Sequence, residues 1–570
     1  MFLTLLAQLV APPTQIGPVR LPGPEAGEQR PDHRRPAPVL ELQPGEGPSP
    51  APPPVPTLGP APDRAPTQER NLPEVRGSSF YSKQQLVGIF QSCLAIADPG
   101  ERLKACAASL SARLVADGFV NSRVYTVTTP APGHLDVVLG RIVEVRVNAK
   151  DAWLKRRITR LLRPLQGEVL NLGELERQLP LLQRQRAVRN LRTALSRLGS
   201  DPTQAVLTVN AELGAQPFQG DFSLRNDGSN GTGDGRAVAT LVKGGVATPG
   251  DLMLLYGELD FADAPTPDLG AVITSLSYTY PLSDQFNLTG SFGYSRRNLV
   301  ELTPPLDQYS TRQLQGLGQL EWVFKETLTQ RWGAFAALSL NGSDNYLSGN
   351  ALPSFLPEVL RSPRTGYLRM GLSGSGLSSS VGWSGNVYAL QGIGALSPST
   401  QIDELAQAGI APGQATALGG LISAAWGFAP SWQLNLRAAG QVALNPLTPA
   451  MQFTIGSDVG LRGLPGQLIS GDNGWLGTGE LVWTFWQKKA QALQLVPFMG
   501  YGGINTKNNV LGLSFTDNVG SGGVLARWLA GERWTLEAGW VDQFSTNDNI
   551  GPWTDWVLGQ GFYGRVQYRF

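Results

Sequence analysis

Long apolar runs and charge are both scarce in this sequence. No run of 18 or more apolar residues occurs, which excludes a membrane-spanning helix. Charged residues make up 16% of the 570 residues, whereas a soluble globular protein usually has about a quarter. Mean hydropathy is only −0.11. Low charge without strong hydropathy is typical of a transmembrane barrel, because lipid-facing apolar residues alternate with small polar residues that face the lumen. The net charge of +1 indicates no class of partner.

Histidine is almost absent, and its scarcity excludes several kinds of site. The two histidines, His33 and His134, lie far apart, and no Ser/His/Asp arrangement surrounds either of them. No His/Cys/carboxylate cluster suits a metal ion, and no glycine-rich loop suits a phosphate. We therefore predict no enzymatic activity, no metal site and no cofactor.

Cysteine occurs only twice. Cys93 and Cys106 lie close together in a segment with helical periodicity. In an exported protein an even number of cysteines indicates a disulfide. We predict a Cys93–Cys106 disulfide, and two free buried thiols are the alternative.

The N-terminal region is apolar at first and then rich in proline. The stretch FLTLLAQLVA (Phe2–Ala11) resembles the apolar region of a signal peptide, so residues 1–11 are interpreted as one. The basic residues that should precede it are missing, so either the signal is atypical or the natural start lies upstream. Residues 12–73 contain 19 of the 43 prolines, a composition that favours extended polyproline segments over a packed core. We interpret residues 12–77 as a linker.

Two α+β modules are predicted next, at residues 78–148 and 149–214. In the first, helical periodicity is followed by the strand-like runs SRVYTV and HLDVVLGRIVEVRVN. In the second, residues 153–165 and 170–198 read as helical and AVLTVNAE as a strand. Residues 150–200 carry twelve Lys/Arg against four Asp/Glu. Because no aromatic residues are interleaved with this basic patch, we interpret it as a solvated face and expect no nucleic-acid partner. Anionic lipid headgroups or an extended polypeptide client would also suit it.

Strict alternation begins after about residue 215. In TSLSYTYPL (274–282) every second residue is apolar and the others are small and polar, and FNLTGSFGYS (286–295) repeats the pattern after a short turn. A soluble sandwich seldom sustains this pattern over residues 215–570. Dividing that region by sixteen leaves about 22 residues for each strand and its connection, which fits tilted transmembrane strands. We predict a sixteen-stranded antiparallel transmembrane barrel.

The chain ends in GFYGRVQYRF, with Tyr568 and Phe570 on the predicted lipid face. A last strand that ends in an aromatic residue is similar to the assembly signal of bacterial outer-membrane barrels. This similarity implies a location in the outer membrane and contact with outer-membrane lipid and the barrel-assembly machinery.

The two modules resemble POTRA domains, the periplasmic units that precede certain outer-membrane barrels. The residues that carry the resemblance are ADGFVNSRVYT (116–126), GHLDVVLGRIVEVRV (133–147) and LNLGELERQLPLLQR (170–184). The order and spacing of these stretches match the POTRA pattern.

Two POTRA-like modules before a sixteen-stranded barrel resemble the two-partner secretion transporters (TpsB, the ShlB/FhaC/HecB haemolysin secretion/activation type). The resemblance covers residues 80–570 and includes LRNDGSNGTGDGR (224–236) and TIGSDVGLRGLPGQLISGDNGWLGTGELVW (454–483). It implies a pore for a secreted partner protein of the haemolysin/haemagglutinin type. A barrel-assembly insertase of the same superfamily, or a passive solute porin, is the alternative.

The resemblance also implies a role for VGLRG. In that family an arginine-glycine motif tips a long extracellular loop that folds back into the lumen, where the arginine pairs with an acidic residue of the inner wall. Arg462 and Gly463 match the motif. The usual Phe-x-Asp-x-Gly of the wall reads FMGYG here, so Gly500 stands at the position of the acidic partner. Alternation along GELVWTFW turns Glu480 inward. We predict that Glu480 is the counter-charge of Arg462, with Asp472 as the alternative.

Overall fold

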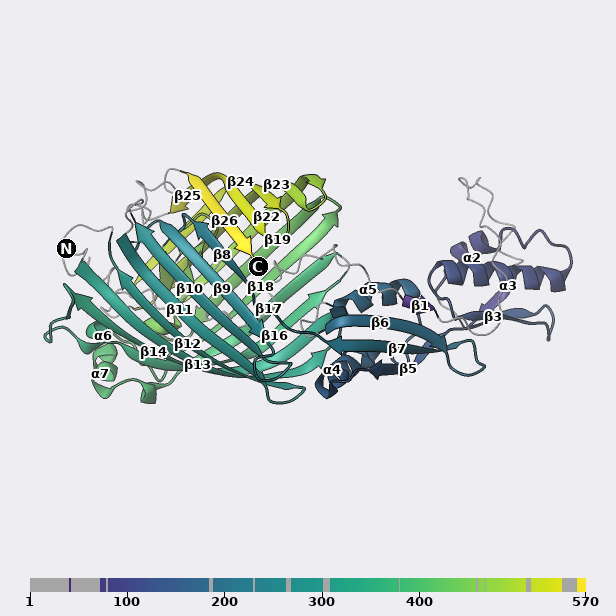
Figure 1. Cartoon of the computed structure of the whole chain (residues 1–570), viewed down its shortest axis with the longest axis horizontal. Coiled ribbons are helices and arrows are strands. Elements are labelled where there is room, and N and C mark those ends of the chain that lie inside the picture. Colours follow the sequence, from purple (N-terminus) through teal and green to yellow (C-terminus); the bar gives the residue numbers. More distant parts are fainter. Residues whose placement is uncertain are drawn as a thin grey trace. The chain divides into compact units, whose positions relative to one another are not determined.

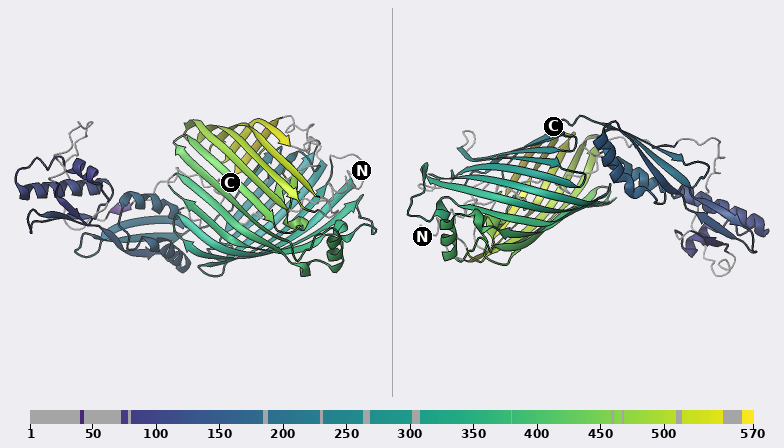
Figure 2. Two further views of the ribbon diagram at one scale, coloured as in Figure 1. Left: turned by 180° about the vertical axis from the view of Figure 1, so that it is seen from behind. Right: turned by 90° about the horizontal axis from the view of Figure 1, so that it is seen from below.

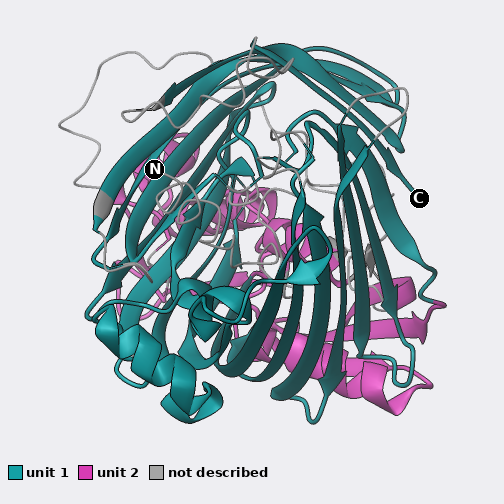
Figure 3. Cartoon of the chain, turned by 90° about the vertical axis from the view of Figure 1, so that its left-hand side faces the viewer, with its two compact units in different colours: residues 1–31, 216–326, 330–570 teal, residues 32–215, 327–329 magenta. Residues whose placement is uncertain are grey.

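The computed structural model describes twelve stretches of the chain, which form two compact units (Figure 3). Residues 216–326 and 330–570 belong to the first unit, and residues 32–215 and 327–329 belong to the second. The signal-peptide interpretation of residues 1–11 lies outside the described residues. Among the helices that are described, none has both the length and the apolar character needed to cross a membrane. The stretches are 40–42, 72–77, 80–183, 188–228, 231–262, 268–300, 308–378, 380–457, 460–466, 468–508, 514–545 and 561–570.

The first α+β module packs two helices, α2 (Lys83–Phe90) and α3 (Pro99–Ala116), on a small sheet. Ser82 and Gln85 form a capping box that begins α2, and the Asp98 side chain accepts the Glu101 amide proton at the start of α3. Cys93 and Cys106 form a disulfide inside the core, beside Phe90 and Leu110. The strands, in sheet order, are β2 (Glu74–Arg76), β4 (His134–Val138) and β3 (Arg123–Val127).

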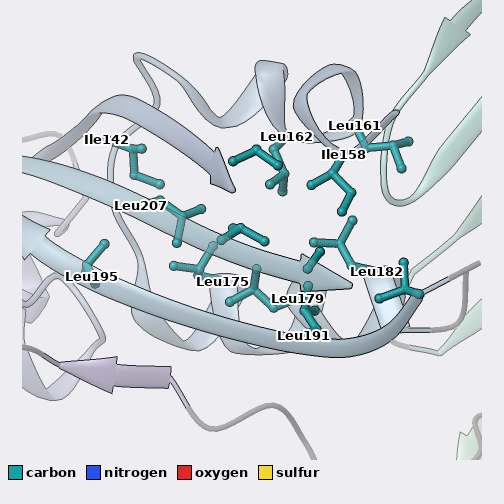
Figure 4. Close-up of a cluster of buried hydrophobic side chains, with 14 of the residues drawn as sticks. Ile142, Ile158, Leu161, Leu162, Leu175, Leu179, Leu182, Leu191, Leu195 and Leu207 are labelled. Carbon is teal, nitrogen blue, oxygen red and sulfur yellow. The ribbon is translucent and has the colours of Figure 1, made fainter. Parts of the chain in front are cut away.

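The second module packs α4 (Ala152–Leu162), the 3₁₀ turn η2 (Arg163–Leu165) and α5 (Leu172–Gln183) on a four-stranded sheet. Leucine and isoleucine side chains from the helices and the sheet fill the core between them (Figure 4). Burial of this apolar surface is the main force that stabilises the module. The strands, in sheet order, are β1 (Leu40–Leu42), β6 (Val188–Arg197), β7 (Gln204–Leu213) and β5 (Arg141–Asn148).

Two details of the modules differ from the sequence analysis. Strand β5 pairs in parallel with β7, so residues 141–148 belong to the second sheet and not to the first module. Residues 188–197 form strand β6 instead of continuing a helix. The reason is tertiary: Leu191, Thr193 and Leu195 alternate with exposed or partly exposed residues, and pairing with β7 outweighs the helix propensity of the intervening arginines and alanine.

The second half of the chain closes into an antiparallel barrel of sixteen long strands and the two-residue β15 (Asn350–Ala351). Figures 1 and 2 show the strands steeply inclined around the ring. The first strand pairs with the last, so the sheet has no free edge. This confirms the predicted fold class. The strands are β8 (Gln219–Arg225), β9 (Gly235–Gly244), β10 (Leu252–Ala262), β11 (Asp268–Pro281), β12 (Phe286–Asn298), β13 (Tyr309–Glu326), β14 (Gln330–Leu347), β16 (Arg364–Leu377), β17 (Val381–Gly392), β18 (Thr416–Ala429), β19 (Trp432–Ala443), β22 (Asn473–Lys488), β23 (Gln491–Thr506), β24 (Phe515–Ala530), β25 (Trp534–Ser545) and β26 (Phe562–Arg569).

The barrel is apolar outside and polar inside. Along β12, Phe286, Leu288 and Phe292 are exposed, whereas Thr289 and Ser295 are buried. A water-soluble protein seldom exposes so continuous an apolar surface, but a barrel in lipid requires one. The alternation read from the sequence therefore has the inside-out sense of a membrane barrel.

The two ends of the barrel differ. Short turns join β11 to β12, β13 to β14, β18 to β19 and β22 to β23 at one end. The long connections lie at the other end and contain the helices α6 (Glu358–Arg361) and α7 (Ser399–Gln407) and the 3₁₀ turns η4 (Gly394–Leu396) and η5 (Pro449–Met451) (Figure 1). Short turns on one side and long loops on the other are typical of outer-membrane barrels, with the loops extracellular.

A belt of aromatic rings surrounds the short-turn end. Trp432 stacks on Trp483 at 5.4 Å between ring centroids, and Trp426 meets Phe428 at 5.4 Å. Each of these residues lies within a few positions of a strand end that enters a short turn. Such belts mark the level of the lipid headgroups, so this end of the barrel lies at a membrane interface.

Candidate functional site

A hairpin from the longest connection folds into the barrel. Its strands, β20 (Phe453–Ile455) and β21 (Ile469–Gly471), pair antiparallel and lie between β19 and β22 in the sequence. We call β20, β21 and the turn between them the lumen hairpin. Ile455, Leu461 and Leu464 are fully buried, against the inward-facing wall residues Leu476, Ile504 and Val519. An apolar patch on an otherwise polar wall therefore seats the hairpin, and Figure 3 shows segments of the chain inside the ring of strands.

The tip of the lumen hairpin is built on glycine. Gly460 and Gly463 have φ of +111° and +79°, values that other residues rarely adopt. At Gly463 a Cβ atom would also lie 2.3 Å from Cγ1 of Val541 on β25. The tip backbone is held by the wall, because Ser521 donates to the Arg462 carbonyl and Gln543 donates to the Gly463 carbonyl.

Arg462 points from this tip to two carboxylates. Its Nε donates to Oε1 of Glu480 at 2.9 Å, and its Nη1 donates to Oε2 of Glu537 at 2.8 Å. Glu480 comes from β22 and Glu537 from β25, so the guanidinium bridges two strands of the inner wall. The Arg462 guanidinium also lies 5.9 Å from the ring centroid of the buried Tyr563 on β26. A planar guanidinium suits this double contact, whereas an ammonium group cannot span both carboxylates in the same way.

Glu537 is the centre of a larger ion cluster. Its side chain is 2% exposed, contacts Arg527 of β24 as well as Arg462, and lies 4.0 Å from Arg565 of β26. Three arginines thus share two carboxylates in a part of the lumen that is largely shielded from water. Each charge is costly to bury alone, and the cluster is stable because its members compensate one another.

The structure brings Arg462 and Glu480 together but places the alternative partner elsewhere. The Asp472 carboxylate accepts from the amides of Leu447 and Lys507 and from the Gln452 side chain. It therefore holds the base of the loop, and within the described part of the chain its hydrogen bonds go to groups other than Arg462.

Gly500 faces the hairpin, and a hairpin side chain fills the space next to it. A Cβ atom at position 500 would lie 2.5 Å from Cδ2 of Leu461, which is fully buried. The space that an acidic side chain would need is thus filled by the leucine next to Arg462, and the second carboxylate comes from β25 instead of β23.

Glu537 was not among the residues predicted from the sequence. The signal that could have found it is the alternation of β25, where Trp534 and Trp540 are exposed and Glu537 lies on the opposite, inward row. A single acidic residue on an inward row is a candidate partner for a lumen arginine. Its distance from Arg462 in the sequence hides the pairing.

A second charged cluster lines the opposite side of the barrel seam. Arg236 of β9 donates to Glu258 of β10 at 2.6 Å and lies 3.8 Å from Asp260, and all three side chains are almost completely buried. The Thr232 hydroxyl, in the β8–β9 loop, donates to Asp260. In the same loop, the Gly228 carbonyl accepts a hydrogen bond from the Gly466 amide of the lumen hairpin. This cluster therefore fixes a loop on which the hairpin rests.

Two other predicted features have clear positions. Cys93 and Cys106 are bonded in the first module. Tyr568 stacks near Phe570, and the Phe570 backbone exchanges hydrogen bonds with Gly220 of β8, so the last residue of the chain takes part in closing the barrel. Within the described residues, no group of three or more His, Cys, Asp or Glu side chains is arranged to hold a metal ion.

Comparison with known proteins identifies the family of the chain. Residues 204–519 match the family model described as haemolysin secretion/activation protein ShlB/FhaC/HecB. The outer membrane transporter CdiB of Dickeya dadantii (strain 3937) is 24% identical over 382 residues, which are 65% of this chain and 64% of that protein. The chain thus matches just under two thirds of the length of this relative.

Two solved structures share the fold. CdiB from Escherichia coli superimposes with a TM-score of 0.55 at 16% identity, covering 87% of this chain and 89% of that one. CdiB from Acinetobacter baumannii gives a TM-score of 0.51 at 16% identity, covering 88% and 89%. The family model covers more than half of the chain. With a closed sixteen-stranded barrel, two α+β modules and an arginine-tipped lumen hairpin, the chain belongs to the haemolysin secretion/activation family, ShlB/FhaC/HecB.

Proposed function

We propose that the protein is an outer-membrane pore that moves a secreted partner protein to the cell surface, with its two POTRA-like modules in the periplasm. Membership of a secretion/activation family and the likeness to an outer membrane transporter support this assignment. The client is an exoprotein of the haemolysin/haemagglutinin type. Its unfolded chain is captured by strand addition at a sheet edge of a module, passes through the barrel and folds outside.

The observation that carries the proposal is the seat of the lumen hairpin. Its arginine is held by two ion pairs and its flanks by a small apolar patch. Coulomb attraction between such groups weakens as water enters. A hairpin held in this way obstructs the lumen at rest and can leave its seat when a client enters.

A passive solute porin fits the molecule less well. A porin needs neither the two periplasmic modules nor an arginine-tipped hairpin with specific partners on the wall. A barrel-assembly insertase shares the architecture. The two functions differ in what is lost when the protein is missing: a secretion pore is needed for one exoprotein, whereas an insertase is needed for other outer-membrane barrels.

The deciding experiment first searches beside this gene for one that encodes a large, exported β-helical protein, then deletes this gene and follows that candidate exoprotein. We expect that exoprotein to disappear from the cell surface and to return when the wild-type chain is supplied, while other outer-membrane barrels keep their abundance. Surface exposure is measured by protease treatment of whole cells. An exoprotein that still reaches the surface, or a general loss of other barrels, contradicts the proposal.

A further inference from the structure

One edge of the second module's sheet is already covered by a strand from the proline-rich region. Strand β1 (Leu40–Leu42) pairs in parallel with β6, in the register Leu40 to Thr193, Glu41 to Ala194 and Leu42 to Leu195 (Figure 1). The region interpreted as a linker thus contributes a strand to a folded sheet. Pairing at a sheet edge is how a folded domain recognises an extended peptide.

The register shows what kind of peptide this edge accepts. Thr193 and Leu195 are buried on the core side of β6, whereas Ala194 is partly exposed on the other side. The covering segment reads Leu-Glu-Leu, and its two leucines are the register partners of Thr193 and Leu195, with the glutamate opposite Ala194. The outward row of β6 also carries the exposed Arg192. The edge therefore suits a strand with alternating apolar residues and an acidic or polar residue between them.

Strand β1 covers only a short part of β6, and prolines on both sides limit its length. Strand β1 has 3 residues and β6 has 10. Pro38 and Pro44 bracket the segment, and a proline cannot donate a backbone hydrogen bond to a neighbouring strand. A longer strand without prolines can pair along more of β6 and displace the short one.

The opposite edge of this sheet, on β5, is covered at its start by the module itself. Ile142 of β5 donates its amide proton to the Glu168 carbonyl and accepts the Gly167 amide, and Arg141 forms a bridge with Val169. A peptide that paired along the full length of β5 would have to break these contacts within the module. The β6 edge requires only the release of β1.

We infer that the β6 edge is the docking site for an extended segment of the secreted client, and that Leu40–Leu42 is a built-in competitor that occupies the site until the client arrives. The inference rests on the proposed function. Because β1 and β6 belong to the same chain, their pairing is intramolecular, and the effective concentration of the competitor at the edge is on the order of 1 mM. A client segment must therefore outcompete a weak but ever-present strand, which discriminates against short or unsuitable sequences.

The first test locks the competitor in place in the full-length protein. Neighbouring strands lie about 4.8 Å apart, within the Cα separation that a disulfide spans, so Glu41→Cys with Ala194→Cys should form a bond on oxidation. The probe is a labelled peptide of residues 37–45, and its binding is followed by fluorescence anisotropy. We expect the oxidised variant to bind no peptide and to recover binding on reduction. The control pair, Glu41→Cys with Arg197→Cys, is out of register by about 10 Å and should behave as wild type.

The second test removes the competitor. The double change Leu40→Asp/Leu42→Asp should free the edge and increase the affinity for the same peptide about tenfold. The inference is overturned if the double change leaves the affinity for the peptide unchanged. It is also overturned if the oxidised Glu41→Cys/Ala194→Cys variant still binds the peptide, for example along the edge of β3.

Secretion of the exoprotein separates this inference from the proposed function. We expect the oxidised staple to stop secretion that the wild type supports. If the wild type secretes and the staple secretes equally, the docking inference fails alone. If the wild type does not secrete, the proposed function fails, and the peptide result still decides whether β6 is a strand-binding edge.

Discussion

At the scale of the residue, Arg462 has two partners in unlike surroundings. The Glu537 side chain is 2% exposed and is shared with Arg527, whereas the Glu480 side chain is 20% exposed and forms its ion pair with Arg462. Removal of one member of a buried ion cluster leaves an uncompensated charge, which costs far more than the loss of a solvated pair. The two glutamates should therefore differ in their contributions to stability.

Glu537→Gln should destabilise the barrel by about 3 kcal/mol, and Glu480→Gln by about 1 kcal/mol or less. Both changes should also raise the conductance of the pore in planar bilayers, because each frees one side of the guanidinium. Stability is measured as the temperature at which the folded band shifts in gel electrophoresis. Glu321→Gln, which breaks the ion pair with Arg331 on β14, is the control and should leave conductance unchanged. An equal loss of stability in Glu537→Gln and Glu480→Gln would contradict the assignment of Glu537 as the centre of the ion cluster.

Gly463→Ala should unseat the hairpin tip. The new methyl group meets Val541 at a distance no Cβ atom tolerates, and φ of +79° strains any residue but glycine. We expect a more conductive pore and reduced secretion. Gly477→Ala on β22 is the matched control, since a Cβ atom there has nothing within 4 Å. A Gly463→Ala pore with wild-type conductance would show that the tip does not need its present position.

Gly500→Asp alone should impair the hairpin instead of strengthening it, because Leu461 occupies the space. Adding Leu461→Ala should restore part of the function, since the aspartate can then reach a cluster in which arginines outnumber carboxylates. Secretion by the two single variants and the double variant gives the coupling. Additive effects would mean that the two side chains do not compete for one space.

At the scale of the element, period-2 alternation was enough to predict the barrel, since every lipid-facing strand must repeat it. It was not enough for β6, whose arginines and leucines also fit a helix and whose strand state depends on β7. The alternation also turned Glu480 inward correctly, but it could not show which inward residues meet across the lumen. Glu537 and Arg462 come together only through the closed ring, and Leu461 covers Gly500 only because the hairpin folds back.

The Cys93–Cys106 disulfide should stabilise the first module alone. The bond closes a loop with a sequence separation of 13, for which loop-closure entropy predicts about 3 kcal/mol. Cys93→Ser/Cys106→Ser in the full chain should therefore speed amide hydrogen exchange in α2 and α3 and leave the exchange of β10 to β19 unchanged. Faster exchange in the barrel would show that the module and the barrel unfold together.

At the scale of the whole molecule, the seam that closes the barrel has the fewest register pairs among the sixteen barrel strands. Strands β26 and β8 share five register pairs, from Arg565–Arg225 to Arg569–Asp221, whereas β13 and β14 pair along nearly their full length. A pore for a client that leaves along the lumen does not need this seam to open. An insertase that passes strands into the membrane does.

A staple across the seam should therefore leave secretion unchanged. Ser223→Cys with Gln567→Cys joins two register partners on the lumen side. A second staple, Leu461→Cys with Gly500→Cys, ties the hairpin to the wall and should block secretion until it is reduced. Gel mobility reports bond formation and protease treatment of cells reports the exoprotein. Secretion that stops with the seam staple would favour lateral opening and the insertase alternative.

Ring closure has a consequence for how the protein is made. The contact between Gln567 and Asp221 joins residues separated by 346 positions, so the barrel remains an open, edge-bearing sheet until the last residues have been synthesised and exported. Long-range pairing of this kind is slow and leaves apolar strands exposed to aggregation meanwhile. A precursor without chaperones should therefore aggregate before the ring closes. A chain that lacks its final strand cannot close the ring and should be degraded before it reaches the membrane, instead of inserting as a smaller pore.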